Sequence, residues 1–194
     1  MSFNPQLADS DGKMHFPSNW PNKFVSEDAG RFVARYRIAK AAKVDFDGGI
    51  SEKIGCAYSA FIKLFLAYSA FEAFQKTFSL SSSDIDKLDQ KYGGDQVVLS
   101  LKTLHNSSPK FFRFIQSHLN SGPAKKNISN FINGNAVTAI SLAKSFRHIF
   151  AHGVLTPSSD GSESNTTKKI GLTLYNHLMH IMDAEAASMA QQKC

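Results

Sequence analysis

Residues 54–74 read IGCAYSAFIKLFLAYSAFEAF, and this stretch decides the fold class. Apolar side chains lie nearly all round a helix of this sequence instead of along one face, which is typical of a helix buried at the centre of a bundle. Lys63 lies near the middle of the segment and Glu72 near its end. Because a central lysine costs roughly 2.5–3.5 kcal/mol on insertion into a bilayer, we expect a buried core helix that starts after Ser51 and ends near Phe78, with no membrane span.

Further helical segments flank this core helix, and neither a strand pair nor an internal repeat is recognisable. Ser26 is a suitable N-cap for a first helix that ends near Lys43, and the last helix is expected over about 168–191. Glycine, proline and serine breakers separate the segments between them. These segments are expected near 84–92, 95–105, 109–119, 125–131 and 135–153. The sequence therefore predicts an all-α fold, an up-and-down helical bundle with additional short helices.

The chain is long enough, at 194 residues, for one domain with a substantial core. Residues 1–25 contain three prolines and little periodicity, so they are expected to form an extended arm ahead of a single helical domain over 26–194. A flexible loop is expected at about 156–167, where serine, glycine and aspartate are frequent. The two cysteines, Cys56 and Cys194, are too far apart in sequence for a disulfide framework or a metal motif. A cytoplasmic protein without a metal or other cofactor is therefore expected.

The positive charge is concentrated in one region of the chain. The formal net charge is +6, yet no aspartate or glutamate occurs between Gln96 and Ser159. The basic residues of this region are Lys102, Lys110, Arg113, Lys125, Lys126, Lys144 and Arg147. An acid-free basic region is expected of a protein that binds a polyanion such as RNA, although a solvated basic surface without a ligand gives the same pattern.

An arginine and two histidines occur together near the end of the helix expected over 135–153, where residues 145–153 read SFRHIFAHG. At about 100° per residue, the polar stripe of this helix carries Ser141, Ser145, His148 and His152, with Lys144 beside it and Arg147 at its boundary. Arginine can bind a phosphate at any physiological pH, and histidine can transfer a proton near neutrality. Arg147, His148 and His152 are therefore candidate catalytic residues, and Lys144 and Ser145 are candidate substrate-binding residues.

Three interpretations of this cluster remain open on the residues alone. In the first, the histidine caps helix carbonyls and the arginine forms an ion pair, with no ligand involved. In the second, His148 and His152 bind zinc at i, i+4 spacing, but Ile149 stands where a zinc protease needs its glutamate base and no third ligand is evident. In the third, Arg147 stabilises the charge of a phosphate while His152 acts as an acid or a base.

A family resemblance supports the third interpretation. Arg147, four intervening residues and His152, with a polar residue after the arginine and Gly153 after the histidine, resemble the signature of the HEPN superfamily. The aromatic-rich segment 67–74 is similar to an early helix of such proteins. The resemblance implies a helical bundle of the HEPN type and metal-independent RNA cleavage at the cleft of a homodimer. In that role Arg147 would stabilise the pentacoordinate phosphate, and His152 would assist attack of the 2′-hydroxyl or protonate the leaving oxygen. His148 would support the substrate or orient a partner.

The function expected from this resemblance is that of an endoribonuclease, with the toxin of a toxin–antitoxin pair as one form and a protein antitoxin as its partner. A non-catalytic module that binds RNA, a nucleotide or a protein partner is the alternative, and a structural dimerisation domain is a third. Val154 occupies the position where some family members carry a modifiable tyrosine, so control by modification there is not expected. Glu72 is a secondary site candidate because it lies on the most apolar helix, although an exposed or locally paired glutamate is the simpler interpretation.

Overall fold

The structure is a computed structural model that describes residues 26–46, 49–104, 107–120 and 122–191. In this part of the chain eight α-helices and one short 3-10 helix are present, and no strand occurs. The elements are α1 (Ser26–Ala41), α2 (Glu52–Thr77), α3 (Ser82–Lys91), α4 (Gly94–Thr103), α5 (Ser107–His118), α6 (Gly122–Ile132), α7 (Ala139–Ala151), η1 (Ser159–Gly161) and α8 (Ser164–Gln191). The predicted all-α fold is confirmed, whereas the arm expected over 1–25 lies outside the described residues.

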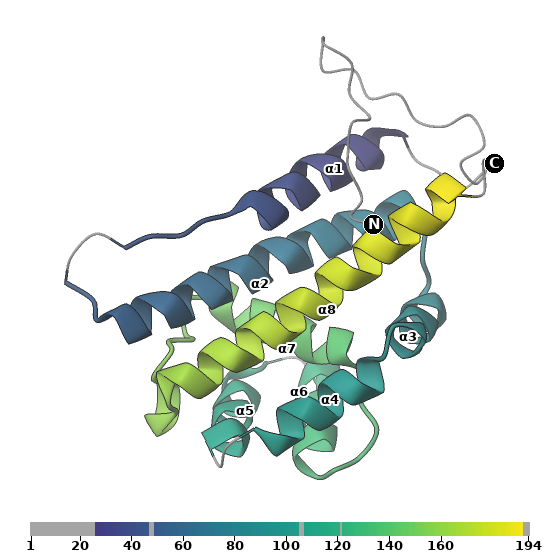
Figure 1. Ribbon diagram of the computed structural model, residues 1–194. Coiled ribbons are helices and arrows are strands. Elements are labelled where there is room, and N and C mark those ends of the chain that lie inside the picture. Colours follow the sequence, from purple (N-terminus) through teal and green to yellow (C-terminus); the bar gives the residue numbers. More distant parts are fainter. Residues whose placement is uncertain (1–25, 47–48, 105–106, 121, 192–194) are drawn as a thin grey trace.

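Three long helices form one layer of the molecule, and the shorter helices α3 to α7 lie below it (Figure 1). The helix α1 runs antiparallel to α2, while α8 lies beside α2 and runs parallel to it. By length and composition α2 is apolar enough to cross a membrane. In the structure it packs against α1, α7 and α8, so the predicted core helix occupies the centre of the fold.

Small side chains allow α2 to approach its neighbours closely. The buried alanines of this helix are Ala57, Ala60, Ala67, Ala70 and Ala73. A Cβ atom at Gly171 of α8 would lie 3.3 Å from the Cβ of Ala60, so a larger residue there would push the two helices apart. Toward α7, aromatic rings fill the wider space, and Phe61 lies edge-on to Phe146 with ring centroids 4.7 Å apart. This contact fixes α7 against α2.

The loop expected over 156–167 is shorter than predicted, because α8 already begins at Ser164. Within the loop Ser159 is buried. Its hydroxyl accepts a hydrogen bond from the Thr156 amide at 2.8 Å and donates one to the Thr156 carbonyl at 2.8 Å. These bonds give the connection between α7 and α8 a defined conformation.

The start of α7 also differs from the prediction. The helix begins at Ala139 and not near Asn135. Its N-cap is Thr138, whose hydroxyl accepts a hydrogen bond from the Ser141 amide at 3.2 Å. This side chain satisfies one of the amides that the first turn of a helix leaves without a partner.

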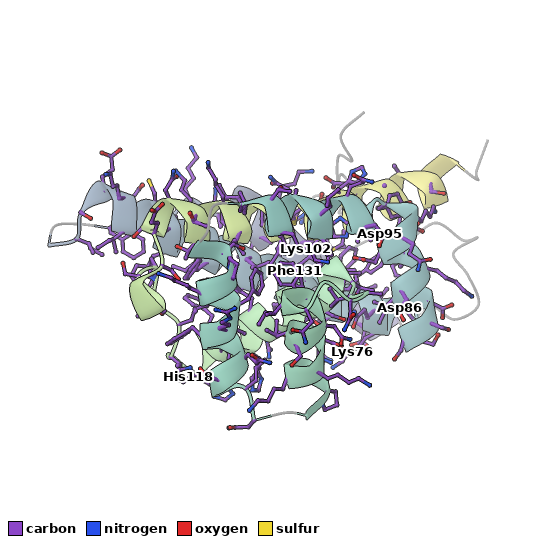
Figure 2. All side chains as sticks on the ribbon, turned by 90° about the horizontal axis from the view of Figure 1, so that it is seen from below. Lys76, Asp86, Asp95, Lys102, His118 and Phe131 are labelled. Carbon is purple, nitrogen blue, oxygen red and sulfur yellow. The ribbon has the colours of Figure 1, made fainter. Side chains whose placement is uncertain are left out.

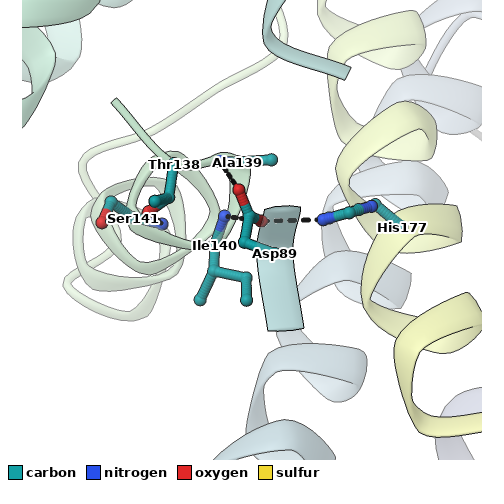
Figure 3. A network of polar contacts seen from close by, with 6 residues as sticks. All are labelled: Asp89, Thr138, Ala139, Ile140, Ser141 and His177. Carbon is teal, nitrogen blue, oxygen red and sulfur yellow. Dashed lines mark hydrogen bonds and ion pairs between the residues drawn. The ribbon is translucent and has the colours of Figure 1, made fainter. Parts of the chain in front are cut away.

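A buried carboxylate from another helix completes the cap of α7 (Figure 3). Asp89 of α3 is 1% exposed and accepts hydrogen bonds from the Ala139 amide at 3.1 Å and the Ile140 amide at 3.2 Å. The Nε2 atom of His177, on α8, lies 2.8 Å from the same carboxylate. Asp89 therefore supplies the partners that α7 lacks and joins α3, α7 and α8 at one point.

Replacement of Asp89 by asparagine keeps the shape of the side chain but removes its charge and one acceptor oxygen. The NH2 group of the asparagine would then stand where one carboxylate oxygen now accepts a hydrogen bond, so we expect the free energy of unfolding to fall by about 2–4 kcal/mol in urea denaturation. Asp86→Asn, at an exposed position of the same helix, is the matched control and should change it by less than about 0.5 kcal/mol. Equal unfolding midpoints for the two variants would contradict the role given to Asp89.

Gly94 of α4 lies directly against the Asp89 carboxylate, and a Cβ atom at this position would overlap the carboxylate oxygens. An alanine in place of a helical glycine normally stabilises a protein by about 0.5–1 kcal/mol. We expect that gain for Gly30→Ala in α1, where an added Cβ meets no atom within 4 Å. Gly94→Ala should instead lower the melting temperature measured by circular dichroism, and a rise in both variants would argue against the close packing of Asp89.

Candidate functional site

The candidate site lies along the C-terminal half of α7, where this helix crosses α2. The apolar arc predicted for α7 is buried at Ala139, Ala143 and Phe146. Phe150 is partly buried, with its ring centroid 5.8 Å from that of Phe61. Because this side of the helix packs on the core, the side with the arginine and the two histidines remains at least partly accessible.

Arg147 is held against α2 by two side chains. Its Nη2 atom donates a hydrogen bond to Oε2 of Glu72 at 3.3 Å, and its guanidinium carbon lies 5.8 Å from the centre of the Phe65 ring. The side chains of Arg147 and Glu72 are 33% and 35% exposed, whereas the Nε atom of Arg147 is buried and has no hydrogen-bond partner. The guanidinium is therefore oriented by α2 while part of it still faces solvent.

Glu72, the secondary candidate from the sequence, thus belongs to the same site as Arg147. Tyr68 lies one turn earlier on α2 and is buried. Burial raises the pKa of the Tyr68 hydroxyl well above its usual value, and the negative charge of Glu72 raises it further, while the positive charge of Arg147 opposes the shift. Tyr68 is therefore a neutral phenol at physiological pH, next to the ion pair.

The two histidines form a contiguous pair at the end of α7. The ring centroids of His148 and His152 are 4.6 Å apart, with an angle of 70° between the ring planes. His148 is partly buried and His152 is exposed. The helix stops here because Gly153 adopts the left-handed conformation, with φ of 71°, and its amide donates to the Phe150 carbonyl at 3.0 Å. Both imidazoles can therefore be reached from solvent at the carbonyl end of the helix.

The two candidate substrate-binding residues lie in different environments. Lys144 is exposed, as the helical periodicity predicts. Ser145 is only 1% exposed, and its hydroxyl donates a hydrogen bond to the Ser141 carbonyl at 3.0 Å. The prediction that Ser145 lies on the exposed polar stripe is wrong, because α7 is covered on more than one side: it contacts α2, α3, α4, α5, α6 and α8. Ser145 is thus not presented to a ligand in solution.

The alternative of a zinc site at His148 and His152 needs at least one further protein ligand. Among the described residues no group of three or more histidine, cysteine, aspartate or glutamate side chains is arranged to hold a metal ion. The described residues therefore supply no third protein ligand for a zinc ion at His148 and His152.

The basic residues of the acid-free region lie on the shorter helices. Apart from Arg147, all are exposed: Lys102, Lys110, Arg113, Lys125, Lys126 and Lys144. Figure 2 shows this side of the molecule, with Lys102 near Phe131 and with two aspartates, Asp86 and Asp95, toward α3. The Nζ atom of Lys102 is 5.8 Å from the centre of the Phe131 ring. The excess positive charge is thus carried by α4 to α7, the part of the fold that includes the candidate site.

Phe65 belongs to the site, although its role was not evident from the sequence. Phe65 and Glu72 are seven residues apart, so both lie on one side of α2. This spacing could have indicated from the sequence that Phe65 lies near Glu72. Comparisons of the chain with protein-family models, with curated proteins and with solved structures give no match. The geometry of the site and the resemblance of its motif are therefore the observations that bear on function.

The Arg147–Glu72 pair can be measured by a double-mutant cycle. Because both side chains are about one-third exposed, solvent screens their attraction. We expect a coupling energy of about 0.2–1 kcal/mol between Arg147→Gln and Glu72→Gln in the free energy of unfolding. Salt at high concentration should reduce this coupling. A coupling of zero at low salt would show that the two side chains do not interact in solution.

Proposed function

We propose that the protein is a metal-independent endoribonuclease of the HEPN type, with Arg147 and His152 as its principal catalytic residues. Two observations on α7 carry the proposal. The partly exposed Arg147 guanidinium is held by Glu72 at 3.3 Å. The same helix carries the two accessible imidazoles of His148 and His152, whose ring centroids are 4.6 Å apart. A fixed cation and a pair of proton-transfer groups are the requirements for cleavage of RNA without a metal ion. The basic surface of α4 to α7 would favour binding of the polyanion.

In the proposed reaction the 2′-hydroxyl of the substrate attacks the adjacent phosphorus, and the bond from phosphorus to the 5′-oxygen breaks. One histidine accepts the proton of the 2′-hydroxyl, and the other donates a proton to the departing 5′-oxygen. Arg147 stabilises the additional negative charge of the pentacoordinate phosphate. The products are a 2′,3′-cyclic phosphate and a 5′-hydroxyl, and the enzyme regains its starting protonation state by exchange with water.

The proposal includes a homodimer. Arg147 and His152 are about 140° apart around the axis of a helix, so the guanidinium and the His152 imidazole of one chain point in different directions from α7. Two copies of α7 facing each other would place an arginine of one chain near the histidines of the other and close a cleft around one phosphate. A toxin role with a protein antitoxin would follow from the family resemblance alone.

The alternative function is that of a non-catalytic module that binds RNA, a nucleotide or a protein at the same surface. The ion pair of Arg147 with Glu72 favours this alternative, because part of the guanidinium charge is already compensated within the chain. Wild-type protein that binds RNA but never cleaves it would support the non-catalytic module over the nuclease.

The nuclease proposal predicts cleavage of a fluorescent single-stranded RNA by the purified protein in EDTA. Arg147→Ala and His152→Ala should each reduce the single-turnover rate by a factor of about 10²–10⁴. Arg31→Ala removes an exposed arginine of α1, outside both the candidate site and the basic helices α4 to α7, and should leave the rate unchanged. A substrate with a single 2′-deoxy sugar at the cleaved position should resist cleavage.

Equal activity in the wild type and the two site variants would show that a contaminating nuclease produces the cleavage. Products that carry a 5′-phosphate instead of a 5′-hydroxyl would contradict attack by the 2′-hydroxyl.

A further inference from the structure

Two arginines from different helices contact α2 within one turn of each other. Arg147 of α7 donates a hydrogen bond to Glu72 of α2 at 3.3 Å. Arg35 of α1 donates a hydrogen bond from Nη1 to the Ser69 carbonyl of α2, also at 3.3 Å. Ser69 and Glu72 are three residues apart, so they are neighbours on one face of the helix, separated by about 4.5 Å along its axis. The two guanidiniums therefore contact the same part of the α2 surface, although they are far apart in the sequence.

The two arginines border a strip of α2 that stays accessible. We call the residues Phe65, Ser69 and Glu72 the α2 strip, and all three are partly exposed. The helices α1 and α7 pack against α2 from different sides (Figure 1). Arg35 reaches the strip from α1, and Arg147 reaches it from α7. A ligand that lies along the strip can thus contact both guanidiniums.

The charge of Arg35 is not compensated by a carboxylate. Arg31, one turn earlier in α1, forms an ion pair with Asp28 at 3.3 Å. Arg35 is exposed, and within the part of the chain that the structure describes its guanidinium bonds to the Ser69 carbonyl and to no carboxylate. A guanidinium has five N–H donors, so most of the donors of Arg35 and its whole charge are available to a ligand.

The hydrogen bond to Ser69 orients Arg35 without satisfying a group that would otherwise lack a partner. Ser69 lies in the interior of α2 (Glu52–Thr77), where each carbonyl already accepts a hydrogen bond from the amide four residues later. A further hydrogen bond at the surface adds little stability, because water can replace the donor. The contact therefore directs the guanidinium toward the α2 strip, and the fold does not depend on it.

Two guanidiniums on one strip match two phosphates carried by one chain. Each guanidinium can bind a phosphate through two parallel N–H donors. Successive phosphates of an RNA strand are joined by a single nucleoside, so a strand with one phosphate at Arg147 can bring the next one to Arg35. The partly exposed Phe65 ring offers an apolar surface for a base beside them. With Glu72 included, the two arginines still leave one net positive charge on this surface.

We propose that Arg35 binds the phosphate adjacent to the scissile one, so that the RNA substrate crosses α2 from the site on α7 toward α1. This inference rests on the proposed nuclease function, which assigns the scissile phosphate to Arg147. Arg35 is then a substrate-binding residue, because the phosphate that it contacts does not react. The smallest substrate that uses the whole surface is a trinucleotide with two phosphodiester groups, whereas a dinucleoside monophosphate contains only the scissile group.

The first test measures binding by fluorescence anisotropy, with a short single-stranded RNA that carries 2′-O-methyl groups throughout and cannot be cleaved. At low salt Arg35→Gln should weaken binding by about three- to tenfold. It should also reduce the slope of log affinity against log salt concentration by about 0.7, the contribution of one phosphate contact in a single strand. Arg31→Gln is the matched control on the same helix and should keep the wild-type affinity and slope. Arg35→Lys keeps the charge and should restore the slope.

The second test separates substrate binding from catalysis in single-turnover cleavage. With a trinucleotide, Arg35→Gln should raise the protein concentration at half-maximal rate and change the maximal rate by less than about twofold. Arg147→Ala should instead lower the maximal rate. With a dinucleoside monophosphate, the wild type and Arg35→Gln should cleave with equal kcat/KM, because the second phosphate is missing. The melting temperature of Arg35→Gln should equal that of the wild type.

Equal affinity and equal salt slope in Arg35→Gln and Arg31→Gln would overturn this proposal, even with the nuclease confirmed. An equal loss of kcat/KM on the trinucleotide and the dinucleoside monophosphate would do the same, because Arg35 would then act on the scissile group. RNA binding without cleavage would overturn the nuclease alone, since the anisotropy measurement tests Arg35 without any reaction. If the wild type binds no RNA, both proposals fail.

Discussion

The position of α7 depends on the buried carboxylate of Asp89. This one side chain accepts hydrogen bonds from two amides at the start of α7 and contacts His177 of α8. In its C-terminal half α7 is fixed by the aromatic contacts of Phe146 and Phe150 with Phe61 of α2. A helix held at both ends can present side chains in a defined direction, so the orientation of the candidate site follows from contacts that take no part in its chemistry.

Two of the carboxylate pairs of the fold differ in burial and therefore in their effect on stability. Asp89 and His177 are almost completely buried, and loss of one member of a buried pair costs about 3–5 kcal/mol because the other member cannot be solvated. Glu72 and Arg147 are about one-third exposed, where an ion pair contributes about 0–1 kcal/mol. The first pair therefore determines the structure, whereas the second can exchange its partner for a ligand at little cost in stability.

The sequence was sufficient for the features that depend on local pattern. The apolar residues around α2 correctly predicted a central helix, and breakers located the shorter helices. The start of α7 was misplaced because Asp89, fifty residues away in sequence, provides its cap. Ser145 was expected to be exposed because helical periodicity separates the faces of a helix but does not reveal how many neighbours cover them. Glu72 and Arg147 were each identified, but their contact across 75 positions required the fold.

The segment between α7 and α8 follows the candidate site directly and is held by ordered contacts. Leu155 is 3% exposed, and the Thr167 hydroxyl donates a hydrogen bond to the Pro157 carbonyl at 2.9 Å. His152 lies directly before this segment and Ser162 lies near its end. Because a change of conformation in such a segment would displace His152, substitutions within it would alter the candidate site indirectly. A substitution on α2, at Glu72, acts on the Arg147 guanidinium without altering this connection.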